Sequence, residues 1–536
     1  MKTLTTSKLF KCIMIIISIT LFWLVLSGTN LQTSGFLKIE QRAGSAELPP
    51  AAQESAYLIV CMPEDRVIFV NQVDGYGITI PAAMKVTENE SSYIRMVLED
   101  EHRRMEIYKQ PLTANNISAN AYISYSNYFL KNTADHKAEL QKKTDINGFP
   151  TVINQWSRNK LLNVADDKNY YACIDIMDKG FVYTFLVKAD IPFDQCGGYE
   201  ELFAGFYTFP ATVKPSTVKM SKTENEFWNT ETRDFYNQYF SPESDLTWGI
   251  FKYSAPQDMW ELNHLEKQLE HDFKFLLVYK HVQKTFTPGY VKSDLDKAYA
   301  KGKTLELTLQ TTSQEAGEGN MVYDILNGQY DPFLQAFAAE TAAFGHPVLF
   351  RFGNEMNGDW CEYSSFHTAR DPEIYKALYK YIYEIFTATG AENVIWVWNP
   401  NEKSFPNFKW NHEIMYYPGD EYVDVVGLTG YNTGNYYNGE KWRSFTEIYD
   451  ELYLKAVRVS DKPLMITEFS SSNAGGSKEA WVEDMFDNLS KYPRIKVAIW
   501  WNGCDLDANG QVARSYFIDE PQELLKIFRD HLKDCK

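Results

Sequence analysis

Eight short, mostly apolar runs follow one another between Asp245 and the C-terminus, separated by segments with helical periodicity. Few protein folds are compatible with this pattern. A regular alternation of strand and helix is typical of parallel α/β domains. Eight such strands with their helices close a barrel of ordinary size. We therefore predict an α/β fold, a (β/α)8 TIM barrel over residues 245–536, with strands at residues 246–251, 275–279, 304–309, 348–352, 394–398, 423–428, 464–467 and 496–500.

The helices of this region carry their own start and stop signals. For a helix over residues 332–344 we expect Asp331 as the N-cap, Pro332 as the first helical residue and Gly345 as the stop. These residue types satisfy or relieve the unpaired backbone groups of a helix end. The same reasoning on apolar spacing predicts helices at residues 259–269 and 521–532.

The preceding region, residues 55–222, alternates in the manner of β-strands and is predicted to be a smaller α+β domain. Its expected strands are residues 76–81, 93–98, 104–109, 151–156, 170–177 and 181–188, with helices at residues 119–130 and 199–206. We interpret residues 210–239 as a polar connection to the barrel. The sequence of this domain shows no nucleophile–base or metal spacing, so a spacer or a surface for a partner is expected, with a main functional role as the alternative.

The N-terminus has the pattern of an export signal. Lys2, Lys8 and Lys11 precede an apolar run over residues 12–26. The run is short for a membrane span, which needs about 20 apolar residues, so residues 1–29 are predicted to be a signal peptide or a signal anchor. Residues 30–54 read as a linker. Either alternative predicts a secreted or membrane-anchored protein with an extracytoplasmic barrel.

Composition narrows the possible partners. A net charge of −18 argues against nucleic acid, whose phosphates would be repelled. The 7 cysteines contain no C-x-x-C pair, so no metal or other cofactor is expected. Cys173 and Cys196 are the likeliest local disulfide in an exported chain, with free thiols as the alternative. The aromatic share of 15% suits sugar rings, which stack on aromatic faces.

Two of the predicted barrel strands end in glutamates. Glu355 follows the fourth strand, residues 348–352, and Glu468 ends the seventh, residues 464–467. Active sites of such barrels lie at the C-terminal ends of the strands. Retaining glycosidases use two carboxyl groups about 5 to 5.5 Å apart, one as acid and one as nucleophile. The pair therefore predicts glycoside hydrolysis.

Several sequence motifs around the two glutamates resemble those of a known glycosidase family. They are Glu355-Met356-Asn357-Gly358 with Trp360, Ile395-Trp396-Val397-Trp398-Asn399-Pro400-Asn401, Gly430-Tyr431-Asn432 and Ile466-Thr467-Glu468. Together they resemble glycoside hydrolase family 26, the β-mannanase family of the barrel clan with catalytic glutamates on strands four and seven. The order of elements in residues 55–222, with Gly77-Ile78-Thr79-Ile80-Pro81 near its start, resembles the photosystem protein PsbP.

The family resemblance implies a role for each site residue. Glu355 is implied as acid/base and Glu468 as nucleophile, with Tyr431 hydrogen-bonded to the nucleophile and Arg351 paired with it from below. Trp360 and Trp500 are implied as platforms for the sugar. All five of the flanking residues, Asn354, Trp360, Tyr431, Trp500 and Arg351, are thus expected to form the substrate-binding site.

One residue departs from the family pattern. Mannanases of the family usually have histidine before the acid/base glutamate, whereas this chain has Asn354, as the wider clan does. We therefore expect a retaining endo-acting hydrolase of a β-linked polysaccharide, which is mannan, β-glucan, xylan or an exopolysaccharide. The alternative is a barrel that binds polysaccharide, or takes part in its assembly, without cleaving it.

Overall fold

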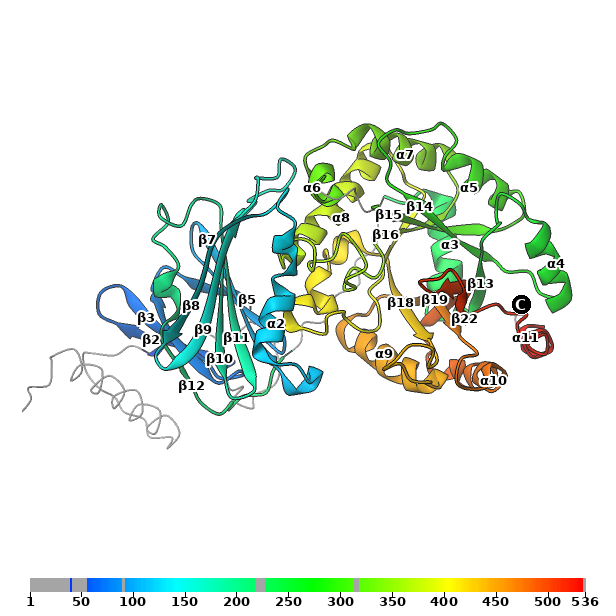
Figure 1. Cartoon of the computed structure of the whole chain (residues 1–536). Coiled ribbons are helices and arrows are strands. Elements are labelled where there is room, and N and C mark those ends of the chain that lie inside the picture. Colours follow the sequence, from blue (N-terminus) through cyan, green and yellow to red (C-terminus); the bar gives the residue numbers. More distant parts are fainter. Residues whose placement is uncertain (1–38, 41–54, 89–91, 217–226, 313–317, 534–536) are drawn as a thin grey trace, which may run out of the picture.

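The computed structural model describes residues 39–40, 55–88, 92–216, 227–312 and 318–533 (Figure 1). The predicted signal segment, residues 1–29, lies outside these ranges. Of the predicted linker only β1 (Ile39–Glu40) is described, as a strand paired with β2. Within the described ranges, none of the helices combines the length and apolar character needed to span a bilayer.

Eight parallel strands close a barrel in the C-terminal part, as predicted. Two of them, β16 and β17, have the predicted bounds, and the others extend the predicted runs by a few residues or shift slightly. The barrel strands are β13 (Thr247–Lys252), β14 (Phe275–His281), β15 (Thr304–Gln310), β16 (Val348–Phe352), β17 (Val394–Trp398), β18 (Val425–Asn432), β19 (Leu464–Ser471) and β20 (Ile495–Asn502).

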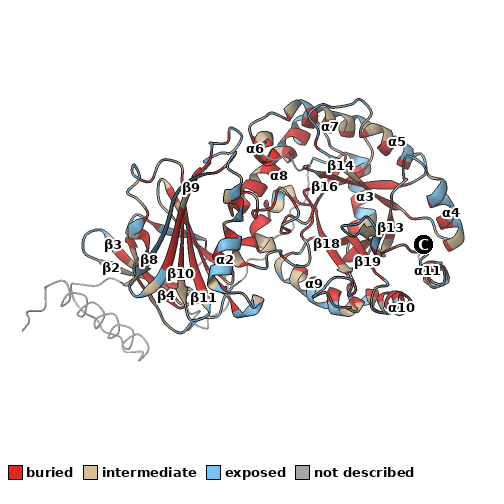
Figure 2. Cartoon of the chain, viewed as in Figure 1, coloured by how far each residue is buried: buried red, intermediate tan, exposed pale blue. Residues whose placement is uncertain are grey.

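Helices surround this barrel and bury their apolar sides against it (Figures 1 and 2). They are α4 (Trp260–Leu269), α5 (Lys292–Tyr299), α6 (Met321–Leu326), α7 (Asp331–Phe344), α8 (Pro372–Ala388), α9 (Phe445–Val459), α10 (Lys478–Asn488) and α11 (Leu524–Leu532). The predicted N-cap of α7 is wrong, since Tyr330 takes that position without a side-chain bond. The Asp331 carboxylate instead accepts a hydrogen bond from Tyr381 at 2.7 Å.

The segment interpreted as a polar connection contains a helix that closes the bottom of the barrel. Helix α3 (Thr230–Phe240) packs Tyr236 and Phe240 against inward-facing barrel residues such as Leu349 and Val497. Polar residues alternate with these aromatic anchors, which is why the sequence looked like a linker. Helix α3 is called the α3 plug below, because its apolar side chains fill the lower end of the barrel. A polar site can therefore form only at the opposite end, at the C-terminal ends of the strands.

The N-terminal part is richer in β-structure than predicted and consists of two sheets that share one core. The five-stranded sheet has the order β1, β2 (Tyr57–Met62), β3 (Arg66–Asn71), β4 (Tyr76–Pro81), β12 (Ala204–Thr208). The seven-stranded sheet has the order β5 (Lys85–Glu88), β6 (Arg95–Glu99), β7 (Arg103–Pro111), β11 (Phe181–Ala189), β10 (Tyr170–Asp178), β9 (Phe149–Ser157), β8 (Lys137–Ile146).

Two predicted helices of this part are shorter than expected. Residues 119–130 form α2 (Ala119–Ser126) and then the 3-10 helix η2 (Tyr128–Lys131). Residues 199–206 form only the 3-10 helix η3 (Glu200–Phe203) before β12 begins. Strand β8 was missed because nearly all its side chains are exposed and polar, so it carries no apolar alternation.

The predicted disulfide between Cys173 and Cys196 is wrong, because both cysteines are free. Their side chains belong to different clusters. Cys173 packs with Trp156, Tyr171 and Ala369, whereas Cys196 lies against the core between the two sheets. The five described cysteines, Cys61, Cys173, Cys196, Cys361 and Cys504, are all free thiols.

Candidate active site

The turn after β16 delivers Glu355 in a strained backbone conformation. Gly353 and Glu355 both have positive φ, 57° and 54°. The Glu355 amide donates to the carbonyl of Asn399, after β17, at 2.8 Å, which holds the turn against the neighbouring strand. A non-glycine residue at positive φ is uncommon and persists where surrounding contacts enforce it, often at functional sites.

The Glu355 carboxyl group lies among neutral hydrogen-bond donors. Asn401 Nδ2 donates to Oε1 at 2.5 Å, and the indole N–H of Trp360 donates to Oε2 at 3.3 Å. Burial, followed by the nearby charge of Glu468, raises the pKa of Glu355 from 4.5 to about 7. A carboxyl group that keeps its proton near neutral pH can act as a general acid.

Glu468 reaches the same site from β19 through an irregularity in the strand. Leu428 of β18 pairs with Ile466, but the next residue, Thr429, pairs with Glu468, so Thr467 is an extra residue. Such a bulge re-aims the side chains that follow it. Thr467 bonds the inward-facing Thr429 hydroxyl at 3.2 Å, and Glu468 also turns inward to meet the residues of the neighbouring strands.

Four side chains surround the Glu468 carboxylate. Arg351 Nη2 lies 2.6 Å from Oε1, the Tyr431 hydroxyl donates to Oε2 at 3.0 Å, and Asn354 Nδ2 lies 3.5 Å from Oε1. The fourth, Tyr279, is hydrogen-bonded to Glu468 and accepts from the indole of Trp501 at 3.2 Å. An arginine and hydroxyl donors favour the ionised form of a carboxyl group. Glu468 is therefore arranged as a carboxylate.

Arg351 is held from below by a second buried glutamate. Its Nε lies 3.0 Å from Glu306, and it donates to Thr308 and Asn399 at 2.8 Å each. Burial, offset by the charge of Arg351, raises the pKa of Glu306 to about 8. The side chain of Arg351 is fully buried, so it pairs with Glu468 as expected but does not bind substrate directly.

Both glutamates line one pocket of about 740 Å³ at the C-terminal end of the barrel. Aromatic side chains form much of its wall, among them Trp360, Tyr431 and three residues that the sequence did not single out, Tyr279, Trp501 and Tyr516. Trp360 has 51% of its surface exposed, as a platform for a sugar ring requires. Asn401 was also missed as a partner of Glu355, although it lies in the motif after β17.

The prediction of Trp500 as a platform is wrong, because Trp500 is buried and the adjacent Trp501 lines the pocket instead. Trp500 has no exposed surface, packs against Phe528, and donates its indole N–H to the carbonyl of Tyr516 at 3.0 Å. Side chains alternate along a strand. Val497 and Ile499 face the barrel interior, so Trp501 shares their side and Trp500 faces the surrounding helices. This alternation was present in the sequence and could have identified Trp501.

Asn354 joins the two halves of the site. Its Oδ1 accepts a hydrogen bond from Gln310 Nε2 at 2.7 Å, which orients Nδ2 toward Glu468. Asn354 is almost completely buried yet lines the pocket. It is therefore placed to donate to a ligand group next to Glu468.

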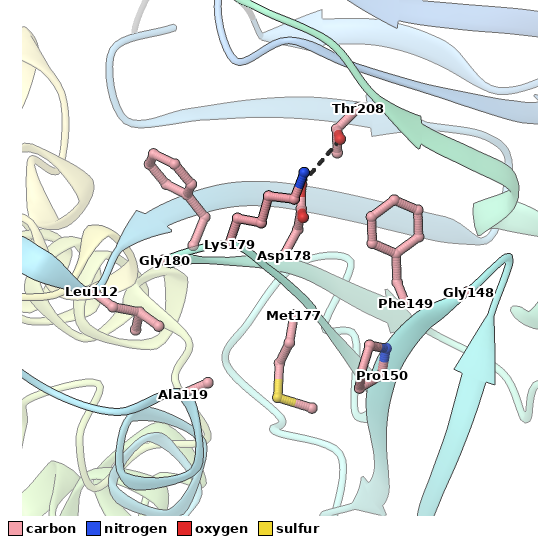
Figure 3. A pocket seen from close by; sticks show the side chains of 11 residues that line it. Leu112, Ala119, Gly148, Phe149, Pro150, Met177, Asp178, Lys179, Gly180 and Thr208 are labelled. Atoms are coloured by element: carbon pink, nitrogen blue, oxygen red, sulfur yellow. Dashed lines mark hydrogen bonds between the residues drawn. The ribbon is translucent and has the colours of Figure 1, made fainter.

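A second pocket, of about 610 Å³, lies at the strand ends of the N-terminal sheets (Figure 3). Phe149, Met177 and Phe181 line it, and its one carboxylate, Asp178, accepts a hydrogen bond from Thr208 at 3.0 Å. Lys179 is its other ionisable residue, so this pocket contains no pair of carboxyl groups. Across the described residues, no group of three His, Cys, Asp or Glu side chains is arranged to hold a metal ion.

A (β/α)8 barrel that brings together two unequal glutamates, one after its fourth strand and one within its seventh, has the arrangement of the barrel glycoside hydrolases. Comparison with known sequences gives a match to one family of this class. The model of Glycosyl hydrolase family 26 matches residues 306–504, which include most of the barrel.

Characterised proteins are similar over the same part of the chain. Endoglucanase H of Acetivibrio thermocellus is 31% identical over 233 residues, which are 43% of this chain and 25% of that protein. A mannan endo-1,4-beta-mannosidase of Bacillus subtilis is 30% identical over 234 residues, 39% of this chain and 58% of that protein. The chain thus spans less than two thirds of either relative. A solved Bacillus subtilis mannanase is 21% identical over 55% of this chain and 90% of its own, with a TM-score of 0.40.

Proposed function

We propose that the protein is a retaining, endo-acting hydrolase of a β-linked polysaccharide, with Glu355 as acid/base and Glu468 as nucleophile. The observation that carries the proposal is the unequal surroundings of two glutamates in one pocket. Glu355 has neutral donors and a pKa raised to about 7, whereas Glu468 is paired with Arg351 at 2.6 Å. Endo action is proposed from the name of the Bacillus subtilis mannosidase.

The reaction follows from these two environments in two steps. Glu468 attacks the anomeric carbon while Glu355 gives its proton to the glycosidic oxygen, so the C–O bond breaks and a glycosyl ester of Glu468 forms. Glu355, now a carboxylate, then takes a proton from water as the water oxygen attacks the same carbon and releases Glu468. Trp360 and Trp501 would stack on the sugars at either side of the bond.

For the substrate we propose a β-glucan ahead of mannan. Asn354 stands where mannanases of the family usually have histidine, and it is placed to donate to a sugar hydroxyl next to Glu468. One of the similar proteins is named an endoglucanase. We also propose export of the protein, on the basis of Lys2, Lys8, Lys11 and the apolar run over residues 12–26.

A panel of polysaccharides with analysis of product length tests the proposal. Purified protein is incubated with mixed-linkage β-glucan, mannan, xylan and the exopolysaccharide of the source organism. We expect new reducing ends, oligosaccharides of several lengths from the earliest times, and products that keep the β configuration by NMR. If none of the four polymers is cleaved while one of them binds, the protein is a non-catalytic polysaccharide-binding protein and the proposal fails.

A further inference from the structure

The loop between β16 and α8, residues 353–371, is unusually buried for a segment without helix or strand. It contains Glu355 and Trp360, and Ser364, Ser365 and Arg370 have no exposed surface. Connecting loops normally run over the surface, because buried backbone groups need partners. Part of the cover comes from the N-terminal sheets and from α2, which lies between the sheets and the barrel in Figure 1.

The C-terminal end of this loop is anchored on strands β10 and β11. Arg370 Nη1 donates to the sulfur of Cys173 at 3.0 Å, and Lys188 Nζ donates to Asp371 at 2.6 Å. Ala369 packs in a cluster formed otherwise by residues of the N-terminal part. Ala369 and Arg370 both have a φ of 59°. Two consecutive non-glycine residues in this region are strained, and the contacts with the sheet hold them there.

A second anchor lies one residue from the sugar platform. The hydroxyl of Tyr125, on α2, donates to Asp359 Oδ2 at 2.5 Å, and its ring lies 5.0 Å from that of Phe366. The ring of Tyr128 also stacks on that of Phe366, with the two ring centroids 5.2 Å apart. Asp359 immediately precedes Trp360, whose indole donates to Glu355. The N-terminal part therefore contacts the loop next to a partner of the acid.

The loop that carries Asn401 is held in the same way. The Asn115 amide donates to the carbonyl of Asn407 at 2.7 Å, and the Trp410 indole donates to Ser126 at 3.1 Å. This loop is also bonded to the loop that carries Glu355, since the backbone N–H of Asn401 donates to Asn357 Oδ1 at 2.8 Å. Both side chains that donate to Glu355 thus come from loops that rest on the N-terminal part.

Glu468 is arranged differently. Its partners Arg351, Tyr431 and Tyr279 lie on barrel strands, and Asn354 is the one partner that belongs to the loop after β16. None of these four residues is bonded to the N-terminal part among the described contacts. The N-terminal part also contacts α6 and the residue before it, where Asn320 donates to Asp135 at 2.7 Å and His136 lies 2.9 Å from the Tyr323 hydroxyl, but none of these residues bonds either glutamate of the site.

We propose that the N-terminal part positions Glu355 for proton transfer, with Tyr125 as a positioning residue that acts through Asp359 and Trp360. This inference rests on the proposed function, since it assumes that Glu355 is the acid. A displacement of about 1 Å in a catalytic group costs about a hundredfold in rate. Loosening this interface therefore slows the step that needs the proton and spares the attack by Glu468.

The test compares two substrates of unequal leaving-group ability in Tyr125→Phe. One is the polysaccharide cleaved by the wild type, and the other is a dinitrophenyl glycoside of the same sugar, whose leaving group needs no proton. Initial turnover of the second substrate is followed in the burst phase, before the deglycosylation step limits it. We expect kcat on the polysaccharide to fall about fivefold, with the dinitrophenyl burst unchanged within twofold.

A control and a stronger variant complete the design. Tyr207→Phe removes a hydroxyl from β12 of the distal sheet and should behave as the wild type. Tyr125→Ala combined with Tyr128→Ala removes both rings from Phe366 and should lower the polysaccharide rate about fiftyfold. Thermal melting checks that each variant folds, and Tyr125→Phe decides the question if the double variant does not.

The outcomes separate this inference from the proposed function. An active wild type whose Tyr125 variants keep full kcat on the polysaccharide would overturn the positioning role alone. An equal fall on both substrates in folded variants would do the same, because a general structural effect does not distinguish leaving groups. A wild type that cleaves none of the polysaccharides would remove the proposed function itself, and the positioning role with it.

Discussion

Strands β16 and β19 each bring a glutamate to the same pocket, and they do so in different ways. Glu355 lies beyond its strand, on a turn with a φ of 54°. Glu468 lies within its strand, where the extra residue Thr467 turns it inward. The loop after β16 is long and rests on the N-terminal part, whereas β19 is one of the eight strands of the closed barrel. The site therefore combines a carboxyl group held by a loop that is anchored on the N-terminal part with one held by a barrel strand.

The charges around the two ends differ as strongly as the backbones. Glu468 faces the guanidinium of Arg351, and Glu355 faces only the neutral donors Asn401 and Trp360. The pKa of Glu355 rises from 4.5 to about 7, which corresponds to about 3 kcal/mol against its ionisation. Part of this rise comes from the charge of Glu468 itself. The charge of Glu468 thus helps to keep the carboxyl group of Glu355 protonated.

Removing the group at the end of β19 should have the largest effect. Glu468→Gln keeps the shape of the side chain but removes the nucleophile, so we expect the rate of polysaccharide cleavage to fall about 10⁴-fold or more. The release of reducing ends measures this. The same variant removes a negative charge from the pocket, so the pKa of Glu355, followed by NMR, should fall. Activity above about one hundredth of the wild type would contradict the assignment.

Removing the acid at the end of β16 should cost less. Glu355→Gln cannot give a proton, and we expect the rate on polysaccharide to fall by about two to four decades. A dinitrophenyl glycoside should still form the glycosyl ester, which then accumulates because the base for its hydrolysis is missing. Mass spectrometry of the intact protein detects this ester on Glu468. If Glu355→Gln lost both substrates equally, the two ends would not have separate roles.

The difference between the two strand ends was only partly predictable from the sequence. The bounds of β16 were predicted correctly because four apolar residues, interrupted only by Arg351, are followed directly by Gly353 and polar residues. The two glutamates followed from their places after apolar runs. The bulge at Thr467 could not be predicted, because the pairing with β18 that creates it depends on a strand distant in sequence.

Contacts between distant segments explain the remaining errors. Lys188 and Asp371 are 183 residues apart, and nothing in the local pattern around either predicts their ion pair. The α3 plug was missed because its buried residues fill a barrel that the segment itself does not reveal. The error of choosing Trp500 instead of Trp501 had a local cause. Side chains alternate between the two faces of a strand, and counting this alternation from the inward-facing Val497 would have identified Trp501.

A single donor to Glu468 should contribute an intermediate effect. Tyr431→Phe removes the hydroxyl that lies 3.0 Å from Oε2 and leaves Arg351 in place. A hydrogen bond to a charged group contributes about 1.5–3 kcal/mol, so we expect kcat to fall about ten- to a hundredfold. Tyr516→Phe is the matched control, because its ring lies 5.4 Å from that of Tyr431 but its hydroxyl bonds Asp505. Similar losses in both variants would mean that only the aromatic wall matters.

Removing a donor to Glu355 should have the smallest effect on rate but a clear effect on its pH dependence. The acid must carry its proton, so activity is present below the pKa of Glu355 and is lost as the pH rises through about 7. The Asn401 amide stabilises the ionised carboxylate and lowers this pKa. Asn401→Ala should therefore move the alkaline limb of kcat/KM to higher pH, with kcat at the optimum reduced about two- to tenfold.

Trp360→Phe removes the weaker donor to Glu355 and should move the alkaline limb less in the same direction. A limb that moved to lower pH in Asn401→Ala would show that Glu355 is not the group that titrates, and the contrast between the two strand ends would have to be abandoned.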